Sequence, residues 1–182
     1  RTRNRRLEVD RLYLNQKGIF IKSNNQTLLN PLNTSCVAAY DYDNDGDEDL
    51  FIGNLSNPKS FGANVNSAIL INDGKGVFTA DFDFRLNAKI TDATWVDVND
   101  DDQKDLLVAT EWGNPQVFIN KNGKLSLLEI PKNLEGLWQS ITAFDIDKDG
   151  DKDILLGNWG LNTKFNATVE NPLRLYYGDF DS

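Results

Sequence analysis

The sequence contains no histidine and a single cysteine, Cys36. One cysteine cannot form an internal disulfide, so a fold that depends on disulfides is excluded. We expect Cys36 to be a small buried thiol in a strand. The lack of histidine removes the most common general base and the most common zinc ligand. An enzyme built on this chain would need lysine, tyrosine or arginine as its base, and no pair of such residues stands out by its spacing.

Long apolar runs are missing as well. No segment approaches the roughly 20 apolar residues that a membrane-spanning helix needs, and no signal-peptide pattern is present. We therefore expect no membrane span. The chain begins at Arg1 rather than at methionine and stops inside a repeated motif. We accordingly expect a processed or excised piece of a longer protein, so the missing signal says nothing about where that protein is located.

What the sequence has in abundance is aspartate at a regular spacing. Residues 41–49 place an acidic side chain at positions 1, 3, 5, 7 and 9 of a nine-residue loop, with Gly46 at position 6. Residues 145–153 repeat this pattern fully, with Gly150 at position 6. Residues 97–105 keep it at positions 1, 3, 5 and 9, with Asp102 in place of the glycine. The candidate metal ligands are Asp41, Asp43, Asp45, Asp47, Asp49, Asp97, Asn99, Asp101, Gln103, Asp105, Asp145, Asp147, Asp149, Asp151 and Asp153. Asp179 and Asp181 begin a fourth loop.

This pattern points to calcium. Carboxylates this close repel one another unless a cation lies among them. A dense set of oxygen ligands on a flexible loop suits calcium better than magnesium. We expect the side chains at positions 1, 3, 5 and 9 and the carbonyl group at position 7 to surround one ion, with a structural role. Glycine at position 6 permits a sharp turn. Asp102 enters left-handed backbone space less easily, so the second loop is the weakest of the three predictions.

The net charge of −9 is concentrated in the loops, which hold 16 of the 28 acidic residues and 3 of the 19 basic ones. The rest of the chain is slightly basic. Nucleic acid as the main partner is disfavoured, because that would require a basic face. The one basic cluster, at residues 1–6, is expected to be a solvated arm at a chain end.

Short apolar segments with turn signals between them predict an all-β protein. Hairpins are expected at residues 12–21, 68–79 and 116–130, and one strand enters and another leaves each acidic loop. Residues 22–34, 54–66 and 159–172 are expected to be connections, and residues 173–177 to start a further strand. First aspartates at 41, 97 and 145 give periods of 56 and 48 residues, with about four strands in each unit. These features are typical of β-propeller blades.

The expected organisation is a partial propeller of about three to four blades, each a four-stranded antiparallel sheet. Residues 1–34 would hold the closing hairpin of a preceding blade and a linker. Residues 35–90, 91–137 and 138–182 would form blades with calcium loops at 41–49, 97–105 and 145–153. An EF-hand or dockerin loop is excluded because position 12 is an apolar strand residue instead of glutamate. The glycine-rich nonapeptides of parallel β-helices are absent.

The loop pattern Asp-x-Asp-x-Asp-Gly-x-x-Asp, followed by a strand such as Asp153 to Asn158, resembles the FG-GAP/VCBS repeat of integrin-α-type propellers. Residues 69–78 are similar to that family's Leu-Asn-x-Gly-x-Gly-x-Phe segment. Residues 157–162, with residues 178–181, are similar to bacterial VCBS-repeat proteins that often carry an ASPIC/UnbV segment. The resemblance covers about residues 11–182. It implies a calcium-supported, exported propeller of about seven blades, a ring that this chain is too short to close alone.

Two classes of function follow. The first is an extracellular, periplasmic or cell-surface binding or adhesion module, with structural calcium and an unidentified protein or glycan ligand. The second is a carbohydrate-active propeller, either a lectin or an enzyme of the polysaccharide lyase type, although no catalytic constellation is evident. Four tryptophans could stack on sugars or could pack between blades: Trp95, Trp112, Trp138 and Trp159. We favour packing. Trp112 and Trp159 follow exit strands at equivalent places and are the better sugar-binding candidates. Packing against further blades or a second copy is also expected.

Overall fold

The computed structural model describes residues 9–24, 30–131, 133–160, 164–168 and 170–178. All the regular structure in these ranges is β-strand, as expected. No helix among the described residues is long and apolar enough to cross a membrane. The first two strands, β1 (Tyr13–Gln16) and β2 (Ile19–Lys22), form a separate antiparallel ribbon. The ribbon corresponds to the hairpin that the sequence predicts at residues 12–21.

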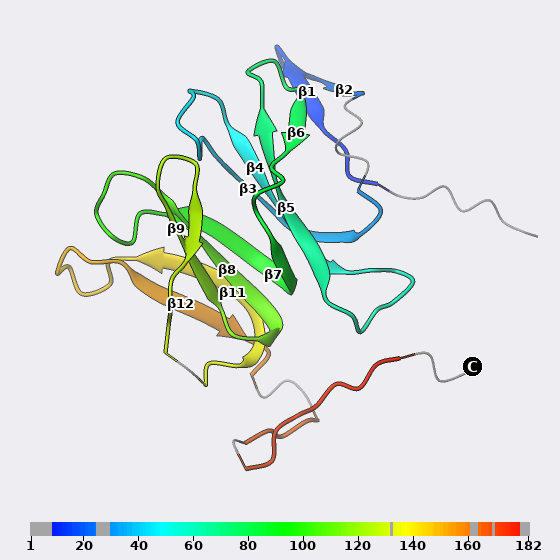
Figure 1. Cartoon of the computed structure of the whole chain (residues 1–182), viewed down its shortest axis with the longest axis vertical. Helices are drawn as coiled ribbons and strands as arrows, with labels where there is room; N and C mark the ends of the chain where they lie inside the picture. Colours follow the sequence, from blue (N-terminus) through cyan, green and yellow to red (C-terminus); the bar gives the residue numbers. More distant parts are fainter. Residues whose placement is uncertain (1–8, 25–29, 132, 161–163, 169, 179–182) are drawn as a thin grey trace, which may run out of the picture.

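Two four-stranded antiparallel blades follow in chain order (Figure 1). The first consists of β3 (Asn33–Tyr40), β4 (Asp49–Ser56), β5 (Val65–Asn72) and β6 (Phe78–Ala80). The second consists of β7 (Leu86–Val96), β8 (Asp105–Gly113), β9 (Gln116–Asn120) and β10 (Leu125–Leu127). A third sheet begins with β11 (Gly136–Phe144) and β12 (Asp153–Asn158). The all-β, partial-propeller fold is therefore confirmed.

The main hydrophobic core lies between the first two blades. Phe51 of β4, Ile90 of β7 and Leu106 of β8 are all fully buried in one cluster, together with side chains from β5 and β9. The apolar exit strands are buried on both faces, which explains why their sequences are continuous rather than alternating. Burying a side chain of this size contributes roughly 1.5–3 kcal/mol. A second cluster, around Leu107 and Ile141, joins the second blade to the third sheet.

The inner strands β3, β7 and β11 each carry an irregularity at an equivalent place, six residues before the acidic loop. At each irregularity one residue of the inner strand has no partner in the pairing with the exit strand, and these residues are Ser35, Thr91 and Gln139. The Ser35 hydroxyl donates a 2.6 Å hydrogen bond to the carbonyl oxygen of Ile90 on β7. The Thr91 hydroxyl donates a 2.9 Å bond to the carbonyl oxygen of Trp138 on β11. The bulge thus turns a polar side chain toward the next blade, where it makes the same contact at both interfaces.

Three expectations about the strands and their connections need correction. The strand that enters the second loop begins at Leu86, well before the apolar residues 93–96 next to the loop, because residues 86–88 pair with residues 65–67 of β5 across the blade boundary. No local sequence pattern shows this pairing. Residues 173–177 form no strand in the structure, since no described strand pairs with them. The predicted connection at 54–66 is shorter than expected, because β4 continues to Ser56 and β5 starts at Val65.

Candidate metal centres in three strand-connecting loops

All three acidic loops close their hairpins in the same register. The residue before position 1 pairs with the aspartate at position 9, as Tyr40 does with Asp49. The equivalent pairs are Val96 with Asp105 and Phe144 with Asp153. Positions 1 to 8 therefore form the connection itself, at one end of each inner hairpin. This placement follows from the apolar strands on either side, whose pairing fixes where the chain must turn.

The aspartate at position 9 fastens each loop to its sheet. Asp49 accepts backbone hydrogen bonds from Tyr42 at 3.1 Å and from Asn72 at 2.8 Å. Asp105 accepts the equivalent bonds from Val98 and Asn120 at 3.0 and 2.8 Å. Both residues are almost fully buried, and burial raises the pKa of each carboxyl group despite these bonds. In the third loop Asp153 is exposed and accepts a 3.0 Å bond from Ile146.

The aspartate at position 1 shapes the turn by accepting bonds from the loop's own backbone. One oxygen of Asp41 accepts from the amide of Asp45 and the other from that of Gly46, both at 3.0 Å. In the second loop Asp97 accepts from the amide of Asp102 at 2.9 Å. In the third loop Asp145 accepts from Gly150 at 3.1 Å. The side chain at position 5 likewise accepts a bond from the amide at position 7 in every loop.

Left-handed backbone at two positions completes the turn. Position 6 has φ of 97° at Gly46, 66° at Asp102 and 104° at Gly150. Asp102 thus adopts the left-handed conformation that glycine takes in the other two loops, and the second loop keeps the same turn without glycine. Position 4 is also left-handed, in residues that the sequence analysis did not single out: Asn44, Asp100 and Lys148. Asparagine and aspartate tolerate this region better than most side chains. The residue types at Asn44 and Asp100 could therefore have indicated the left-handed turn, whereas Lys148 could not.

Two of the loops bring carboxylates together. In the first, one oxygen from each of Asp41, Asp43 and Asp49 lies within 4.8 Å of the others. In the third, Asp145, Asp147 and Asp149 meet the same criterion. Of the other predicted ligands in these loops, Asp45, Asp47, Asp151 and Asp153 lie outside the two groups. At position 7 the expected ligand is the backbone carbonyl group, which these side-chain groups do not test. The carboxylate of Asp47 lies against Gly74 in the turn between β5 and β6.

Asp43 provides the test of whether these groups fit a cation. Its Oδ1 atom is buried and has no hydrogen-bond donor among the described residues. Burial, with the charges of Asp45 and Asp41, raises the pKa of the Asp43 carboxyl group. A buried carboxylate oxygen without a donor is costly unless a positive charge meets it. The donor set of hard oxygens therefore fits a divalent cation of the calcium type, held by Asp41, Asp43 and Asp49.

The second loop is arranged differently. Among the residues that the structure describes, Asp97, Asp101 and Asp105 do not form such a group. Asn99 at position 3 donates from its side-chain amide to Asp101 at 3.1 Å. Gln103 at position 7 accepts a 2.7 Å bond from the amide of Asn122 in the turn after β9. Position 3 of the second loop therefore supplies an amide group that donates to a carboxylate, whereas position 3 of the other two loops is itself a carboxylate. Asp179 and Asp181, the start of the expected fourth loop, lie outside the described residues.

Two asparagines that the metal prediction omitted anchor the first two loops. Asn72 and Asn120 end the third strand of their blades, and their backbone amides bond to position 9. The side-chain amide of Asn120 also donates a 2.9 Å bond to the carbonyl oxygen of Tyr42 in the first blade's loop. Gly123 packs directly against Asp43, so the second blade covers the first loop. Both strands end in Ile-Asn, and this repetition in the sequence could have identified the two asparagines.

A family comparison matches residues 97–156 to the FG-GAP-like repeat. The chain carries an FG-GAP-like repeat. The match begins at position 1 of the second loop and continues through the third loop to Leu156 of β12. No curated protein matches the chain. The FG-GAP-like repeat, the antiparallel blades and the repeated loop register together make this a β-propeller-type module. The finer resemblance to VCBS and ASPIC/UnbV proteins stays a prediction.

The tryptophans of this chain fall into two groups. Trp95 is buried beside the rings of Tyr40 and Tyr42, with centroids 5.4 and 6.2 Å away. Trp138 packs at the second interface and donates to the carbonyl oxygen of Leu134 at 2.9 Å. Packing is thus the role of these two. Trp112 and Trp159 are 37% and 45% exposed, and they are the two that the sequence marked as sugar-binding candidates.

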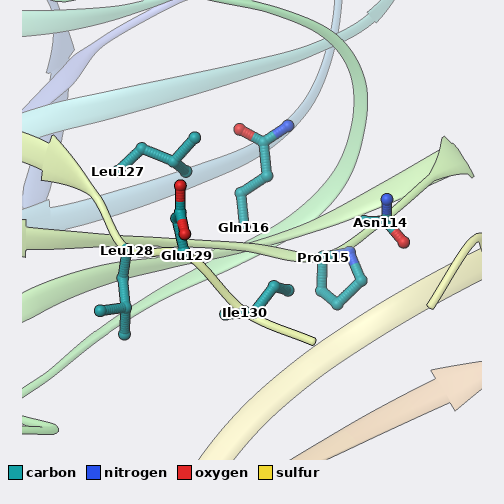
Figure 2. A pocket seen from close by; sticks show the side chains of 7 residues that line it. All are labelled: Asn114, Pro115, Gln116, Leu127, Leu128, Glu129 and Ile130. Atoms are coloured by element: carbon teal, nitrogen blue, oxygen red, sulfur yellow. The ribbon is translucent and has the colours of Figure 1, made fainter. Parts of the chain in front are cut away.

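One shallow groove lies beside β9, between residues 114–116 and residues 127–130 (Figure 2). Its walls combine Pro115 and the apolar side chains of residues 127, 128 and 130 with the polar Gln116. Glu129 is the one titratable side chain among the residues that line it. A general acid and base pair needs two titratable groups within reach of one substrate, so this groove does not supply one.

Proposed function

We propose that this chain is a calcium-binding β-propeller segment of an exported protein, and that it serves as a binding or adhesion module. The observation that carries the proposal is the convergence of Asp41, Asp43 and Asp49, with one buried oxygen of Asp43 lacking a donor. A second group in the third loop supports it, where Asp145, Asp147 and Asp149 converge from positions 1, 3 and 5 instead of 1, 3 and 9. Calcium would neutralise carboxylates that otherwise repel one another.

In this proposal calcium acts on stability. The first loop lies between two blades, because Asn120 and Gly123 of the second blade contact Tyr42 and Asp43. An ion in the first loop would therefore stiffen the loop and the adjoining interface. Binding to the native state alone stabilises it by about 2.7 kcal/mol when calcium is present at 100 times its dissociation constant. Extracellular sites typically bind at about 10⁻⁴ to 10⁻³ M, which suits a compartment with millimolar calcium.

The partner would bind on the rigid platform that the blades provide. Trp112 and Trp159 favour a glycan as one class of ligand, since their partly exposed rings can stack on a sugar. A protein ligand is the other class. We propose a binding module in preference to a lyase-type enzyme, because a lyase would need a base of tuned pKa beside the metal. The groove beside β9 offers no lysine, tyrosine or arginine among its lining residues.

The test is calcium titration of EDTA-treated protein by calorimetry, with thermal melting in parallel. We expect binding heat and a rise in melting temperature. Asp43→Asn should abolish binding at the first loop and Asp147→Asn at the third, each leaving the other site intact. Asp83→Asn is the matched control, because Asp83 is exposed and lies outside the loops. Wild-type protein that shows neither heat nor stabilisation at 10 mM calcium, a concentration well above the range of such sites, would overturn the proposal.

A further inference from the structure

Two exposed tryptophans lie on either side of strand β11. Trp112 is near the end of β8, and Trp159 follows the last residue of β12. At its start β11 pairs with β8 on one edge and with β12 on the other, as Figure 1 shows. Because neighbouring strands lie about 4.8 Å apart, the backbones of the two tryptophans are about 10 Å apart. Both rings therefore belong to the same end of the third sheet.

Leu137 of β11 connects the two positions in one row across the strands. It pairs with Glu111 of β8, and its carbonyl oxygen accepts a 3.3 Å bond from the amide of Trp159. Residues directly opposite one another in antiparallel strands share a face of the sheet. The side chains of Glu111 and Trp159 therefore lie on one face, and Trp112 is next to Glu111 in the chain.

Trp112 has an unusual backbone conformation. It is the extra residue of a bulge, since Glu111 and Gly113 on either side of it pair with consecutive residues of β11. Its φ is 65°, and a bulky side chain in this left-handed region is a genuine outlier. Gly160, which follows the third loop at the same distance as Trp112 follows the second, has φ of 60°. Glycine would make this turn without strain, so the turn does not explain the indole ring. Bulges and strained residues are common beside functional sites, where they re-aim a side chain.

Packing does not explain the two rings either. Trp112 and Trp159 are 37% and 45% exposed, and neither belongs to the three hydrophobic clusters, unlike the other two tryptophans. The pair beside the bulge, Gly113 with Gly136, has no side chains that could cover Trp112. Both indole rings therefore offer aromatic surface to a ligand.

Glu111 adds a hydrogen-bonding group to this surface. It is half-buried, and among the described residues its carboxylate has no hydrogen-bond or ion-pair partner. Residues 111–116 and 157–160 contain no other charged side chain. A fitting ligand has apolar faces that stack on the rings and hydroxyl groups that donate to the carboxylate. A negatively charged ligand would be repelled.

We propose that Trp112 and Trp159 form one platform for an uncharged oligosaccharide, with Glu111 accepting hydrogen bonds from its hydroxyl groups. The inference rests on the proposed role of the chain as a binding module and names the site and class of ligand. It does not involve the metal loops, because the acidic loops precede β8 and β12 whereas the tryptophans lie where these strands end.

Titration with uncharged oligosaccharides tests the platform on the unmodified chain. The probes are cellohexaose, mannohexaose, xylohexaose and N-acetylchitohexaose, with their disaccharides for comparison and hexagalacturonate as the acidic counterpart. The indole N–H signals in ¹H–¹⁵N correlation spectra report binding, in EDTA and in calcium. Calcium titration of the same protein tests the metal sites separately, so either proposal can fail alone.

We expect an uncharged hexasaccharide to shift the signals of Trp112 and Trp159 but not those of the other two tryptophans. It should bind at least about tenfold more tightly than its disaccharide, which is too short to engage both rings. Hexagalacturonate should bind at least about tenfold more weakly than the uncharged probe. The inference is overturned if none of the four uncharged probes shifts both signals, if the disaccharide binds equally well, or if hexagalacturonate binds more tightly.

Trp112→Gly separates a binding role from a structural one. Glycine relieves the left-handed backbone, so we expect little loss of melting temperature but at least about tenfold weaker binding. Trp159→Ala should weaken binding similarly, and Glu111→Gln by at least about threefold. Phe82→Ala is the matched control, because Phe82 is 76% exposed but lies in the connection after β6.

A Trp112→Gly protein that binds as the wild type does would contradict the proposal. So would one that unfolds, because the ring would then have a packing role. Unchanged affinity in Glu111→Gln would remove Glu111 from the site, and an equal loss in Phe82→Ala would show non-specific association instead of a platform.

Discussion

The side-chain amide of Asn120 donates a 2.9 Å hydrogen bond to the backbone carbonyl oxygen of Tyr42, so a strand of the second blade holds the acidic loop of the first. The Asn120 side chain is 1% exposed, and its oxygen accepts a 3.1 Å bond from Gly123. The loop is therefore part of an interface between blades. Its geometry depends on residues about 80 positions away in the sequence.

Asn120→Ala should destabilise the protein by about 2 kcal/mol, because it leaves the carbonyl group of Tyr42 buried without a partner. The measurement is urea denaturation in EDTA. Asn72→Ala is the matched control, since Asn72 occupies the same place in the first blade. Among the described residues, the hydrogen-bond partners of its side chain are Glu48 and Gly76, both within that blade. We expect a smaller loss there, and equal losses would show that the contact between blades contributes nothing of its own.

Asp102→Gly should stabilise the protein by about 0.5–1 kcal/mol, because Asp102 holds φ at 66° and glycine adopts this conformation without strain. Denaturation in EDTA measures the change. Asp102→Asn removes the same charge but keeps a side chain in the left-handed region, so its gain should be smaller. If both variants gained equally, charge relief would be the cause instead of backbone strain.

Lys89→Met should loosen the connection at residues 57–64. Lys89 is 2% exposed, and its ammonium group donates 3.0 Å bonds to the carbonyl oxygens of Leu55 and Phe61. It also lies 4.9 Å from the centroid of the Phe61 ring. Methionine keeps the length of the side chain but donates nothing, so we expect a loss of about 2 kcal/mol.

Trypsin provides the local measurement for this variant, because Lys59 lies within the connection. Cleavage after Lys59 should become faster in Lys89→Met than in the wild type. Lys75→Met is the control, since it removes an exposed lysine in the turn between β5 and β6. Unchanged cleavage in Lys89→Met would contradict the anchoring role.

Cys36 should react slowly while the protein is folded. Burial, and secondarily the charge of Asp92, raises the pKa of its thiol to about 11 from an ordinary value of 9.0. Alkylation by iodoacetamide at pH 8 should therefore be much slower in native protein than in urea, because the thiolate is the nucleophile. In the structure Cys36 is half-buried in β3, not fully buried as the sequence predicts. Similar rates in both would contradict the shielding of the thiol in the folded protein.

The same shift makes a prediction about stability. The folded state favours the neutral thiol, so its contribution is complete below pH 9 and is lost as the pH rises toward 11. Wild-type protein should accordingly lose stability relative to Cys36→Ala over this interval. A constant difference between the two proteins from pH 8 to 11 would show that the thiol does not ionise differently on folding.

Much of the fold could be predicted from local sequence. Short apolar segments separated by turn residues such as Asp73-Gly74 mark hairpins, because a tight turn needs particular backbone angles. The regular spacing of the loops indicated repeated blades, and the residue types indicated hard-cation chemistry. These properties depend on neighbours within a few residues, so they can be identified in the sequence itself.

Contacts between distant residues were decided only by the tertiary structure. The pairing of residues 86–88 with β5, the bond from Asn120 to Tyr42 and the placement of Lys89 beneath residues 57–64 join parts of different blades. The same holds for which carboxylates converge, since Asp41, Asp43 and Asp49 meet whereas Asp97, Asp101 and Asp105 do not. Spacing brings such side chains near one another. Whether their oxygens share one point depends on backbone angles and on the strands packed around the loop, which a single local pattern does not encode.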